Sequence, residues 1–308
     1  MPERFQHVAV LKGGPGAERE VSLRSGAAVA AGLRDAGYTV DEVEVRRLDF
    51  TLPAGVEAVF PVLHGEFGED GMVQRRLEEL GAPYVGGRSW EMPRSFDKEI
   101  SHALLAANGL PVATHEMITA GMKPTLPLPL VLKAPRQGSS IGVEIVREAG
   151  QLDGALARTF VHGPRVLVEA YVPGRECTVG FLGDDALPLI EIVPAEGAYD
   201  FQAKYERNDT RYLVPAPFPA DWMEKINALA RRAYSVLGGR HLGRVDFRVT
   251  EDGQPVILEL NPLPGFTATS LLPKAAAAAG MDFATLCARI MNMAESQSEC
   301  METETTSP

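Results

Sequence analysis

The chain has few cysteines, no long apolar run and no excess of basic residues, and each shortage excludes a class of protein. Its three cysteines, Cys177, Cys287 and Cys300, are widely spaced and follow no metal-ligand pattern. A disulfide framework is therefore excluded, and a reducing, cytoplasmic location is expected. No run approaches about 18 apolar residues and no long apolar segment stands near the N-terminus, so we expect no contact with a membrane.

The charge balance is acidic, with a formal net charge of −11 and a pI near 5.1. Such a chain is a poor match for nucleic acid, and it must gather Lys and Arg locally wherever it binds an anion. Hydrophobic residues make up 45% and charged residues 23% of the sequence, which is ordinary for a soluble globular protein. A length of 308 residues suits two or three domains.

The first ninety or so residues alternate between strand and helix patterns. We expect strands at His7–Leu11, Thr39–Val45 and Ala58–Leu63, and helices at Glu20–Ala36 and Met72–Leu80. This alternation predicts an α/β domain with a parallel sheet covered by helices on both faces.

The rest of the chain mixes the two patterns less regularly, after a stretch around Trp90–Arg94 in which we expect no regular element. It predicts two α+β domains. Helices are expected at Asp97–Asn108, Gln151–Thr159 and Met223–Leu237, and strands at Leu130–Ala134, Arg165–Ala170, Cys177–Leu182 and Pro188–Val193. We place the domains at 1–94, 95–176 and 177–295, with a disordered tail at 296–308.

The most informative segment is a hairpin with Asp252-Gly253 at its tip. If these are the two turn residues, the residue numbers of any two opposite residues add up to 505. Asp246 then faces Glu259, and Arg244 faces Asn261, all with side chains on one side of the sheet.

Two facing carboxylates repel by roughly 4 kcal/mol at an effective dielectric of about 20, so a cation is expected between them. Asp246, Glu259 and the Asn261 amide are oxygen ligands of the kind that Mg²⁺ prefers, and Mg²⁺ commonly bridges substrate phosphates. The alternative is a solvated face on which Arg244 neutralises one acid. Four convergent polar groups among apolar neighbours favour the metal.

Phosphate binding is indicated by the loop Pro135–Val143, which is rich in Gly and Ser and lies between two expected strands. Its backbone N–H groups can approach an anion, and Lys133 on the preceding strand can reach a phosphate. The loop lacks the Gly-Lys-Ser/Thr ending of a P-loop. Alone it would be a flexible turn, and the neighbouring acids make it the second half of an ATP–Mg²⁺ site.

Two further segments follow expected strands, where open α/β sheets bind ligands. Gly13–Glu20 fails the dinucleotide spacing, and Glu18 either balances the dipole of the next helix or binds an ammonium group. For His64, a structural role as a capping or core residue and a functional role are equally favoured by its position alone. Glu69 is expected to start the next helix. The long polar stretch Ala195–Val214 is either an active-site lid or disordered.

Taken together, these segments resemble the D-alanine–D-alanine ligases, ATP-grasp enzymes of cell-wall synthesis. The carrying segments are GGPGAEREVSLRSG, VLHGEFGEDGMVQ, FDKEISH, VLKAPRQGSSIGV, YDFQAKY, GRVDF, LELNPLPGFTATSLLPKAAAAAG and FATLCARI. Each is a weak signal alone, but their occurrence in this order covers nearly the whole chain. The resemblance implies an ATP-grasp fold in which ATP lies between the central and C-terminal domains. It also implies that two D-alanines are joined through a D-alanyl phosphate for peptidoglycan synthesis.

The resemblance also implies roles for individual residues. At the nucleotide and its two Mg²⁺ ions (Mn²⁺ being a possible substitute) it places Lys98, Lys133, Ser139, Ser140, Glu169, Tyr171, Val172, Glu176, Lys204, Asp246, Glu259 and Asn261. At the two D-alanines it places Glu18, His64, Ser139, Lys204, Tyr205, Arg244, Gly265, Ser270 and Leu271. Among these, Glu18, Ser139, Arg244, Gly265 and Ser270 are the catalytic set, with Arg244 and the Gly265 amide at the oxyanion. A homodimer is expected from the family alone.

The chain departs from the usual family pattern beside several of these residues. Gly16 stands where Ser is usual, and Phe96, Pro262 and Phe266 replace Met, Thr and Met.

Three alternatives remain open from the sequence. The chain could be a D-alanine–D-lactate or D-alanine–D-serine ligase, against which Lys204-Tyr205 argues. It could be an ATP-grasp ligase for another amino acid. It could also be a non-catalytic nucleotide-binding protein, which would not need the complete set of Arg244, Asp246, Glu259 and Asn261.

Overall fold

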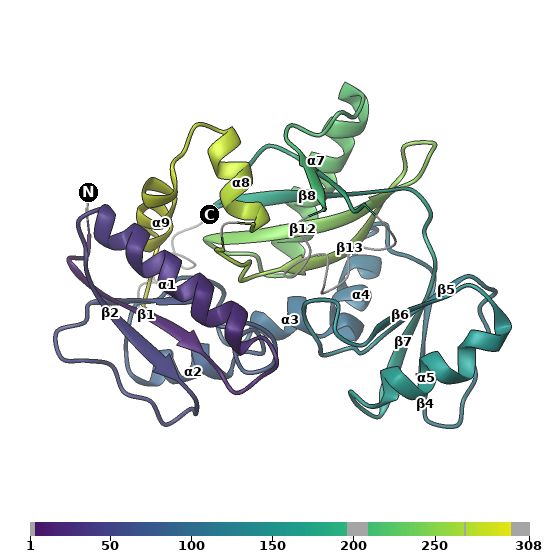
Figure 1. The fold of residues 1–308 in the computed structure, drawn as a ribbon, viewed down its shortest axis with the longest axis horizontal. Coiled ribbons are helices and arrows are strands. Elements are labelled where there is room, and N and C mark those ends of the chain that lie inside the picture. The colour runs from purple at the N-terminus through teal and green to yellow at the C-terminus, as the bar shows by residue number, and fades with distance from the viewer. Residues whose placement is uncertain (1–3, 196–208, 268, 297–308) are drawn as a thin grey trace.

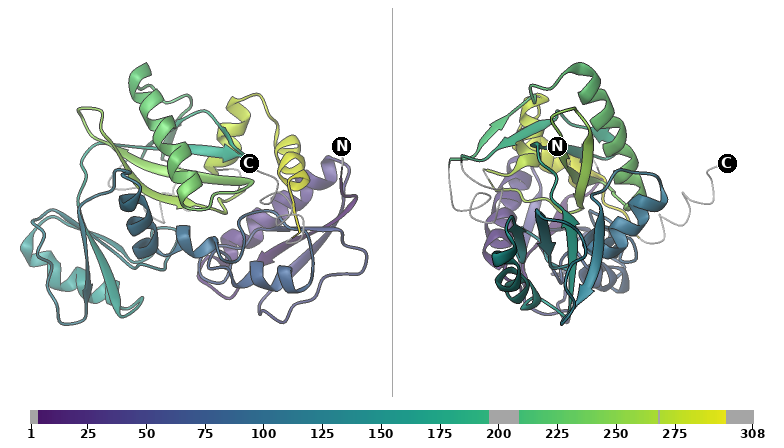
Figure 2. Two further views of the ribbon diagram at one scale, coloured as in Figure 1. Left: turned by 180° about the vertical axis from the view of Figure 1, so that it is seen from behind. Right: turned by 90° about the vertical axis from the view of Figure 1, so that its right-hand side faces the viewer.

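The fold is a row of three sheets, described here from a computed structural model that covers residues 4–195, 209–267 and 269–296. The N-terminal sheet and the central sheet lie at opposite ends of the long axis, and the third sheet bridges them (Figures 1 and 2). The chain therefore has the mixed α/β and α+β organisation predicted from its sequence. The domain limits stay a prediction, and residue 176 lies inside a strand of the third sheet.

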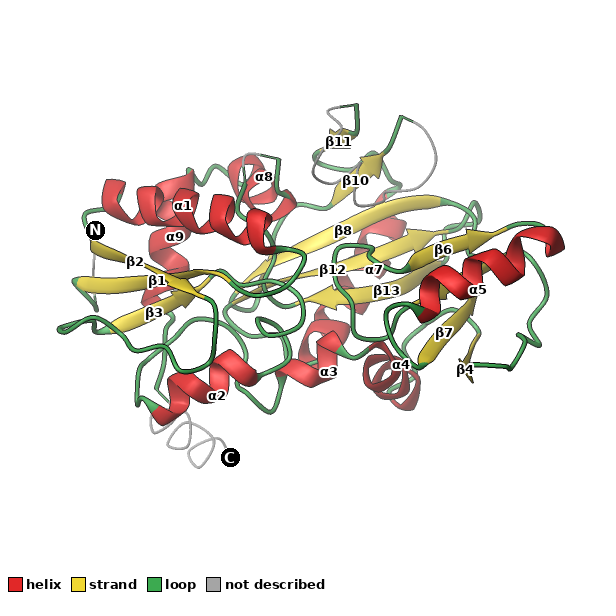
Figure 3. Ribbon diagram, turned by 60° about the horizontal axis from the view of Figure 1, so that its bottom comes forward, coloured by secondary structure: helices red, strands yellow, loops and turns green. Residues whose placement is uncertain are grey.

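The N-terminal sheet is parallel, in the order β2-β1-β3, with strands β1 His7–Gly13, β2 Thr39–Val45 and β3 Ala58–Pro61. Its helices are α1 Arg19–Asp35 and α2 Met72–Glu79. Alternate side chains of β1 enter different cores: Val8 and Val10 pack with α1, whereas Ala9 and Leu11 pack with α2. Helices thus cover both faces, as the strand–helix alternation predicted (Figure 3).

A short helix, α3 Met92–Phe96, follows where no regular element was expected. Only five residues long, it is too short to be stable alone, and its buried Met92 and Phe96 hold it by tertiary packing. The next helix is α4 Lys98–Ala107, whose N-cap Asp97 accepts a hydrogen bond from the Glu99 N–H.

The central sheet is antiparallel, in the order β4-β7-β5-β6, and packs on one helix. Its elements are β4 His115–Thr119, β5 Leu130–Lys133, β6 Val143–Val146, η1 Ala149–Gln151, α5 Leu152–Phe160 and β7 Arg165–Ala170. The Gly/Ser loop joins β5 to β6, as expected.

The C-terminal sheet is also antiparallel, in the order β11-β10-β8-β12-β13, with β9 paired to β8. Its strands are β8 Arg175–Leu182, β9 Asp185–Ala186, β10 Ile190–Val193, β11 Arg211–Leu213, β12 Leu242–Val249 and β13 Pro255–Asn261, and α7 Ala220–Val236 packs on it. Buried Cys177 lies in this core, as predicted.

The β12–β13 hairpin corrects the expected turn but keeps the expected pairs. Near the tip, Val249 pairs with Pro255, so the numbers of opposite residues sum to 504. The Thr250 N–H donates to the Gln254 carbonyl at 3.1 Å, which leaves a loop of three residues that ends in Gly253 at φ 77°. Between Asp246 and Phe247 the register shifts by one, because Leu258 is an extra residue in a β-bulge. Beyond the bulge Asp246 faces Glu259, and Arg244 faces Asn261, as predicted.

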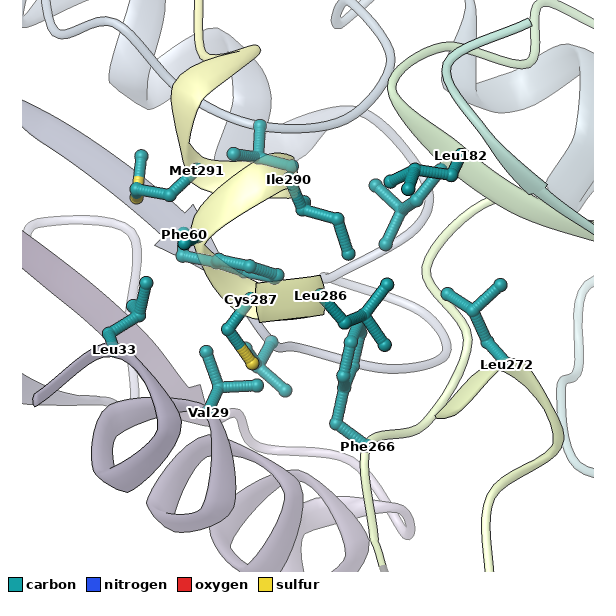
Figure 4. Packing of buried hydrophobic residues seen from close by; sticks show 14 of the residues in the cluster. Val29, Leu33, Phe60, Leu182, Phe266, Leu272, Leu286, Cys287, Ile290 and Met291 are labelled. Atoms are coloured by element: carbon teal, nitrogen blue, oxygen red, sulfur yellow. The ribbon is translucent and has the colours of Figure 1, made fainter. Parts of the chain in front are cut away.

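The largest core joins the two ends of the chain (Figure 4). The last helices, α8 Leu271–Ala278 and α9 Phe283–Asn292, return to the N-terminal sheet, where Cys287 and Ile290 pack near Phe60. Phe266, one of the departures from the family pattern, meets Phe60 edge to face with ring centroids 5.5 Å apart. Within the residues described, no helix is long and apolar enough to cross a bilayer.

Candidate functional site

Two cavities meet between the sheets and share the side chains of Lys98, Gln137 and Glu259. The polar cavity is also lined by Glu18, His64, Glu69, Ser95, Phe96, Gly138, Ser139, Arg244, Leu260, Asn261, Gly265, Thr269, Ser270 and Leu271. The mixed cavity is also lined by Val131, Lys133, Ser140, Val143, Ile145, Arg147, Glu169, Ala170, Tyr171, Val172, Glu176, Asp246, Arg248 and Leu258.

Glu18 connects the N-terminal sheet to the Gly/Ser loop. It lies just before α1, is 6% exposed, and accepts a hydrogen bond from the Ser139 hydroxyl. Its carboxylate lies against two glycines: a Cβ atom at Gly65 or Gly138 would come within 2.3 Å or 2.9 Å of Oε2. A buried carboxylate in so close a setting is suited to a small cationic ligand.

His64 and Glu69 form a buried pair deeper in the polar cavity, with Nδ1 and Oε1 3.7 Å apart. Burial alone would lower the pKa of His64, but Glu69 and Glu18 raise it above its usual value. The expectation for Glu69 was wrong. Helix α2 begins at Met72, whose N–H donates to the Asp70 carboxylate at 3.0 Å, whereas Glu69 turns inward to the histidine.

The Gly/Ser loop holds a strained backbone beside both cavities. Ser139 and Ser140 have φ values of 50° and 61°, a left-handed region that non-glycine residues seldom adopt. Lys98 is tied to this loop because its Nζ donates to the Gln137 carbonyl at 2.8 Å. Strain of this kind concentrates at ligand clamps.

The hairpin acids are held differently from each other. Arg244 binds Asp246 through two hydrogen bonds of 2.8 Å, and Thr178 donates to the same carboxylate at 2.6 Å. This is the contact that the non-metal alternative predicted. Glu259 lies 3.4 Å from Lys98 Nζ, and the buried Asn261 Oδ1 accepts no hydrogen bond from any residue that the structure describes. An unsatisfied oxygen beside two carboxylates fits a hard cation.

Glu169 organises the charged end of the mixed cavity. Its carboxylate lies 2.7 Å from Lys133 Nζ and 3.2 Å from His102 Nε2. Burial would raise the pKa of Glu169, but Lys133 and His102 outweigh it and lower the pKa to about 2. The glutamate is therefore ionised and keeps the Lys133 ammonium in the wall of the cavity.

Arg248 is a residue of the mixed cavity that the sequence reasoning missed. Its guanidinium donates to the Tyr171 hydroxyl at 3.1 Å and to the Val172 carbonyl at 3.2 Å, and it lies 3.4 Å from Glu176. It follows Arg244 and Asp246 at a spacing of two along β12, so the strand period could have found it.

The structure thus brings together every candidate residue that it describes. Ser139 lines the polar cavity rather than the mixed one, and Asp246 lines the mixed one. Lys204 and Tyr205, and most of the expected lid, lie outside the described residues. Ser270 stands directly before α8, and its hydroxyl accepts a hydrogen bond from the Thr267 N–H at 2.9 Å.

Two family models match most of the chain. The model described as "D-ala D-ala ligase C-terminus" covers residues 103–292, and the one described as "D-ala D-ala ligase N-terminus" covers residues 41–87.

Curated relatives and solved structures agree with these models. D-alanine–D-alanine ligase of Methylacidiphilum infernorum is 41% identical over 292 residues, which is 95% of this chain and 96% of that one. The Acidiphilium cryptum ligase is 44% identical over 293 residues, covering 92% and 97%. The Bacillus anthracis ligase, solved as a complex with ATP, superposes with a TM-score of 0.84 at 30% identity and covers 98% of this chain and 100% of that one.

Proposed function

The chain belongs to the D-alanine–D-alanine ligase family, and we propose that it joins two D-alanines while converting ATP to ADP and phosphate. It is a ligase of peptidoglycan precursor synthesis. The observation that carries the proposal is the meeting of two cavities of different chemistry at Lys98, Gln137 and Glu259. A phosphate at this junction would lie beside a carboxylate in the polar cavity.

ATP fits the mixed cavity. The adenine would lie among the apolar side chains of Val131, Ile145 and Leu258, beside the backbone of Tyr171 and Val172 and the carboxylate of Glu169. Glu176 would bind the ribose. Lys133 and Lys98 would contact the phosphates, with Ser139, Ser140 and, from the lid, Lys204 closing over them.

The two D-alanines fit the polar cavity. Glu18 would bind the ammonium group of the first and His64 its carboxylate, with help from Ser139 and Tyr205. Ser270, at the positive end of α8, and Lys204 would bind the carboxylate of the second. Leu271 would contact its methyl group.

Asp246, Glu259 and Asn261 would hold Mg²⁺, or Mn²⁺ in its place. The unsatisfied Asn261 Oδ1 and the facing carboxylates support this set. Bound there, the ions would neutralise the charge of the ATP phosphates. Because Arg244 occupies both oxygens of Asp246, ion binding would require Arg244 to share that carboxylate.

The reaction follows from the weakness of a carboxylate as an electrophile. An oxygen of the first D-alanine attacks the γ-phosphorus of ATP, the bond to the bridging oxygen breaks, and ADP leaves. The neutral amine of the second D-alanine attacks the acyl phosphate, loses its proton, and expels phosphate. Arg244 and the Gly265 N–H would stabilise the tetrahedral oxyanion between these steps. Because water would hydrolyse the acyl phosphate, a lid over the polar cavity is required.

The test is phosphate release from Mg-ATP with D-alanine, L-alanine, D-serine or D-lactate, with products weighed by mass spectrometry. We expect release with D-alanine together with D-alanyl-D-alanine. Two results would contradict the proposed substrate. One is phosphate release that does not depend on D-alanine, and the other is a product that contains D-lactate or D-serine in preference to a second D-alanine. We also propose that the protein is cytoplasmic and forms a homodimer. Light scattering in solution would test the dimer.

A further inference from the structure

His241 stands at a contact between the N-terminal and C-terminal sheets, away from both cavities. It directly precedes β12, the strand that carries Arg244 and Asp246. Its Nδ1 accepts a hydrogen bond from the Gly86 N–H at 3.1 Å, and its carbonyl accepts one from the Gly183 N–H at 2.7 Å. The side chain therefore joins β12 to a segment 155 residues earlier.

The backbone at His241 is strained, which marks the position as one that its surroundings hold in place. Its φ is 60°, and the Leu242 N–H donates to the Arg240 carbonyl at 2.6 Å across it, which closes a three-residue γ-turn. γ-Turns with a positive φ are rare, and such conformations persist only where neighbouring contacts impose them.

Gly86 is in turn tied to the strand that leads to His64. The Val85 N–H donates to the Val59 carbonyl at 3.0 Å, so this segment extends the N-terminal sheet beside β3. A short path thus runs from β3 along the backbone to Gly86, through the His241 side chain, and along β12 to Arg244.

The His241 imidazole is neutral, as it must be for Nδ1 to accept the hydrogen bond from the Gly86 N–H. Burial, with help from Arg240 and Arg88 and against Glu295, lowers the pKa of His241 to about 4. The ring is neutral at physiological pH, and Nδ1 is free to accept while Nε2 carries the proton.

We propose that His241 is a positioning residue that sets the distance between the N-terminal and C-terminal walls of the polar cavity. The inference rests on the proposed function. Glu18 and His64 come from the first wall, and Arg244 and Ser270 from the second. None of the described residues that line the mixed cavity comes from the N-terminal sheet or its helices, so a loosened contact at His241 affects D-alanine binding and spares ATP binding.

Two variants separate the hydrogen bond from the strained backbone. Asn tolerates a positive φ and places Oδ1 where Nδ1 lies, so His241→Asn keeps both features. Gly accepts the φ without strain but has no acceptor, so His241→Gly removes only the hydrogen bond and the ring.

The experiment measures steady-state kinetics with each substrate varied in turn, beside thermal unfolding. For His241→Gly we expect the KM for D-alanine to rise about tenfold, with the KM for ATP within twofold of wild type. His241→Asn should restore the D-alanine KM.

A rise of both KM values together in His241→Gly, or no change in either, would overturn the inference, as would failure of His241→Asn to restore the lower KM. A variant that is merely unstable would lose active enzyme, which lowers the apparent kcat without separating the two KM values. Absence of D-alanine turnover in the wild type would overturn the proposed function instead, so the two failures are distinct.

Discussion

Each cavity is lined by a buried glutamate that lies beside a histidine. The pKa of one glutamate is lowered from its usual value, and the pKa of the other is raised. Burial raises the pKa of Glu169 in the mixed cavity, but Lys133 and His102 lower it to about 2. Burial also raises the pKa of Glu69 in the polar cavity; His64 opposes this, but Glu18 adds to it, and the pKa stays raised.

The charged residue beside each Glu–His pair, Lys133 in one cavity and Glu18 in the other, therefore decides which charge the cavity offers to a ligand. A lysine beside the Glu–His pair neutralises Glu169 and leaves an ammonium group in the wall of the mixed cavity, where an anion such as phosphate can contact it. A second carboxylate beside the pair leaves the polar cavity able to bind an ammonium group and a carboxylate together. Four predictions test this division, in order of decreasing effect.

The largest effect is expected where the cavities meet. Glu259→Ala and Asp246→Ala should each reduce kcat by about 10³-fold, because the charge of the transferring phosphoryl group would lose its counter-ions. Circular dichroism should show an unchanged fold. Near-normal turnover in both variants would contradict the metal assignment, and Glu251→Ala, in the exposed hairpin loop, is the matched control.

Removal of one charge from the polar cavity should affect one substrate only. Glu18→Gln should raise the KM for D-alanine by about 100-fold and leave the KM for ATP unchanged, since a charge-assisted hydrogen bond contributes about 1.5–3 kcal/mol. Initial rates at varied D-alanine and ATP measure both values. Glu20→Gln, exposed two residues later, should behave as wild type, and an equal rise in both KM values would remove Glu18 from the ammonium site.

The bulge residue tests the apolar end of the mixed cavity. Leu258→Ala should raise the KM for ATP by about tenfold, because loss of most of a buried aliphatic side chain costs roughly 1–2 kcal/mol of contact. The KM for D-alanine should stay within twofold. Val256→Ala, on the same strand but lining neither cavity, is the control, and the adenine assignment fails if both variants respond alike.

The smallest effect is a shift in pH dependence. Since the pKa of His64 is raised above its usual 6.5, the protonated form that binds a carboxylate persists to higher pH than in an ordinary histidine and is lost as the pH rises through the raised pKa. The KM for D-alanine should therefore increase at alkaline pH. In Glu69→Gln the increase should begin at lower pH, because burial then acts on His64 with less opposition.

Exposed Glu66 supplies the control, as Glu66→Gln should keep the wild-type profile. A profile that Glu69→Gln leaves unchanged would show that another group titrates.

The hairpin shows how far sequence reasoning reached. Strand period and the Asp252-Gly253 signal led to the pairs Asp246–Glu259 and Arg244–Asn261, which are present. The two-residue turn was wrong. The three-residue loop shifts the register by one residue, and the bulge at Leu258 shifts it back. The two shifts cancel, so the predicted pairs at the site are correct although the predicted turn is not. A bulge depends on the packing of both strands, and neither strand alone reports it.

Glu69 and Arg248 mark the other limit. Glu69 resembles a residue of a first helical turn, and only the burial of His64 beside Glu18 explains why it turns inward. Arg248 lies on the period of β12, but its partners Tyr171 and Val172 come from the end of the central sheet. Contacts between segments so far apart in sequence are set by domain packing.

The sequence by itself determined the parallel N-terminal sheet and the hairpin pairs, which follow from periodicity and from turn signals between residues close in the chain. Its resemblance to a known family gave the family and the candidate site residues, whose roles stay a prediction. The tertiary structure alone decided that the pKa of Glu169 is lowered while that of Glu69 is raised, that Leu258 bulges into the mixed cavity, and that His241 joins two distant sheets. Burial and charge at a site come from side chains that different elements bring together, and a linear pattern does not contain those distances.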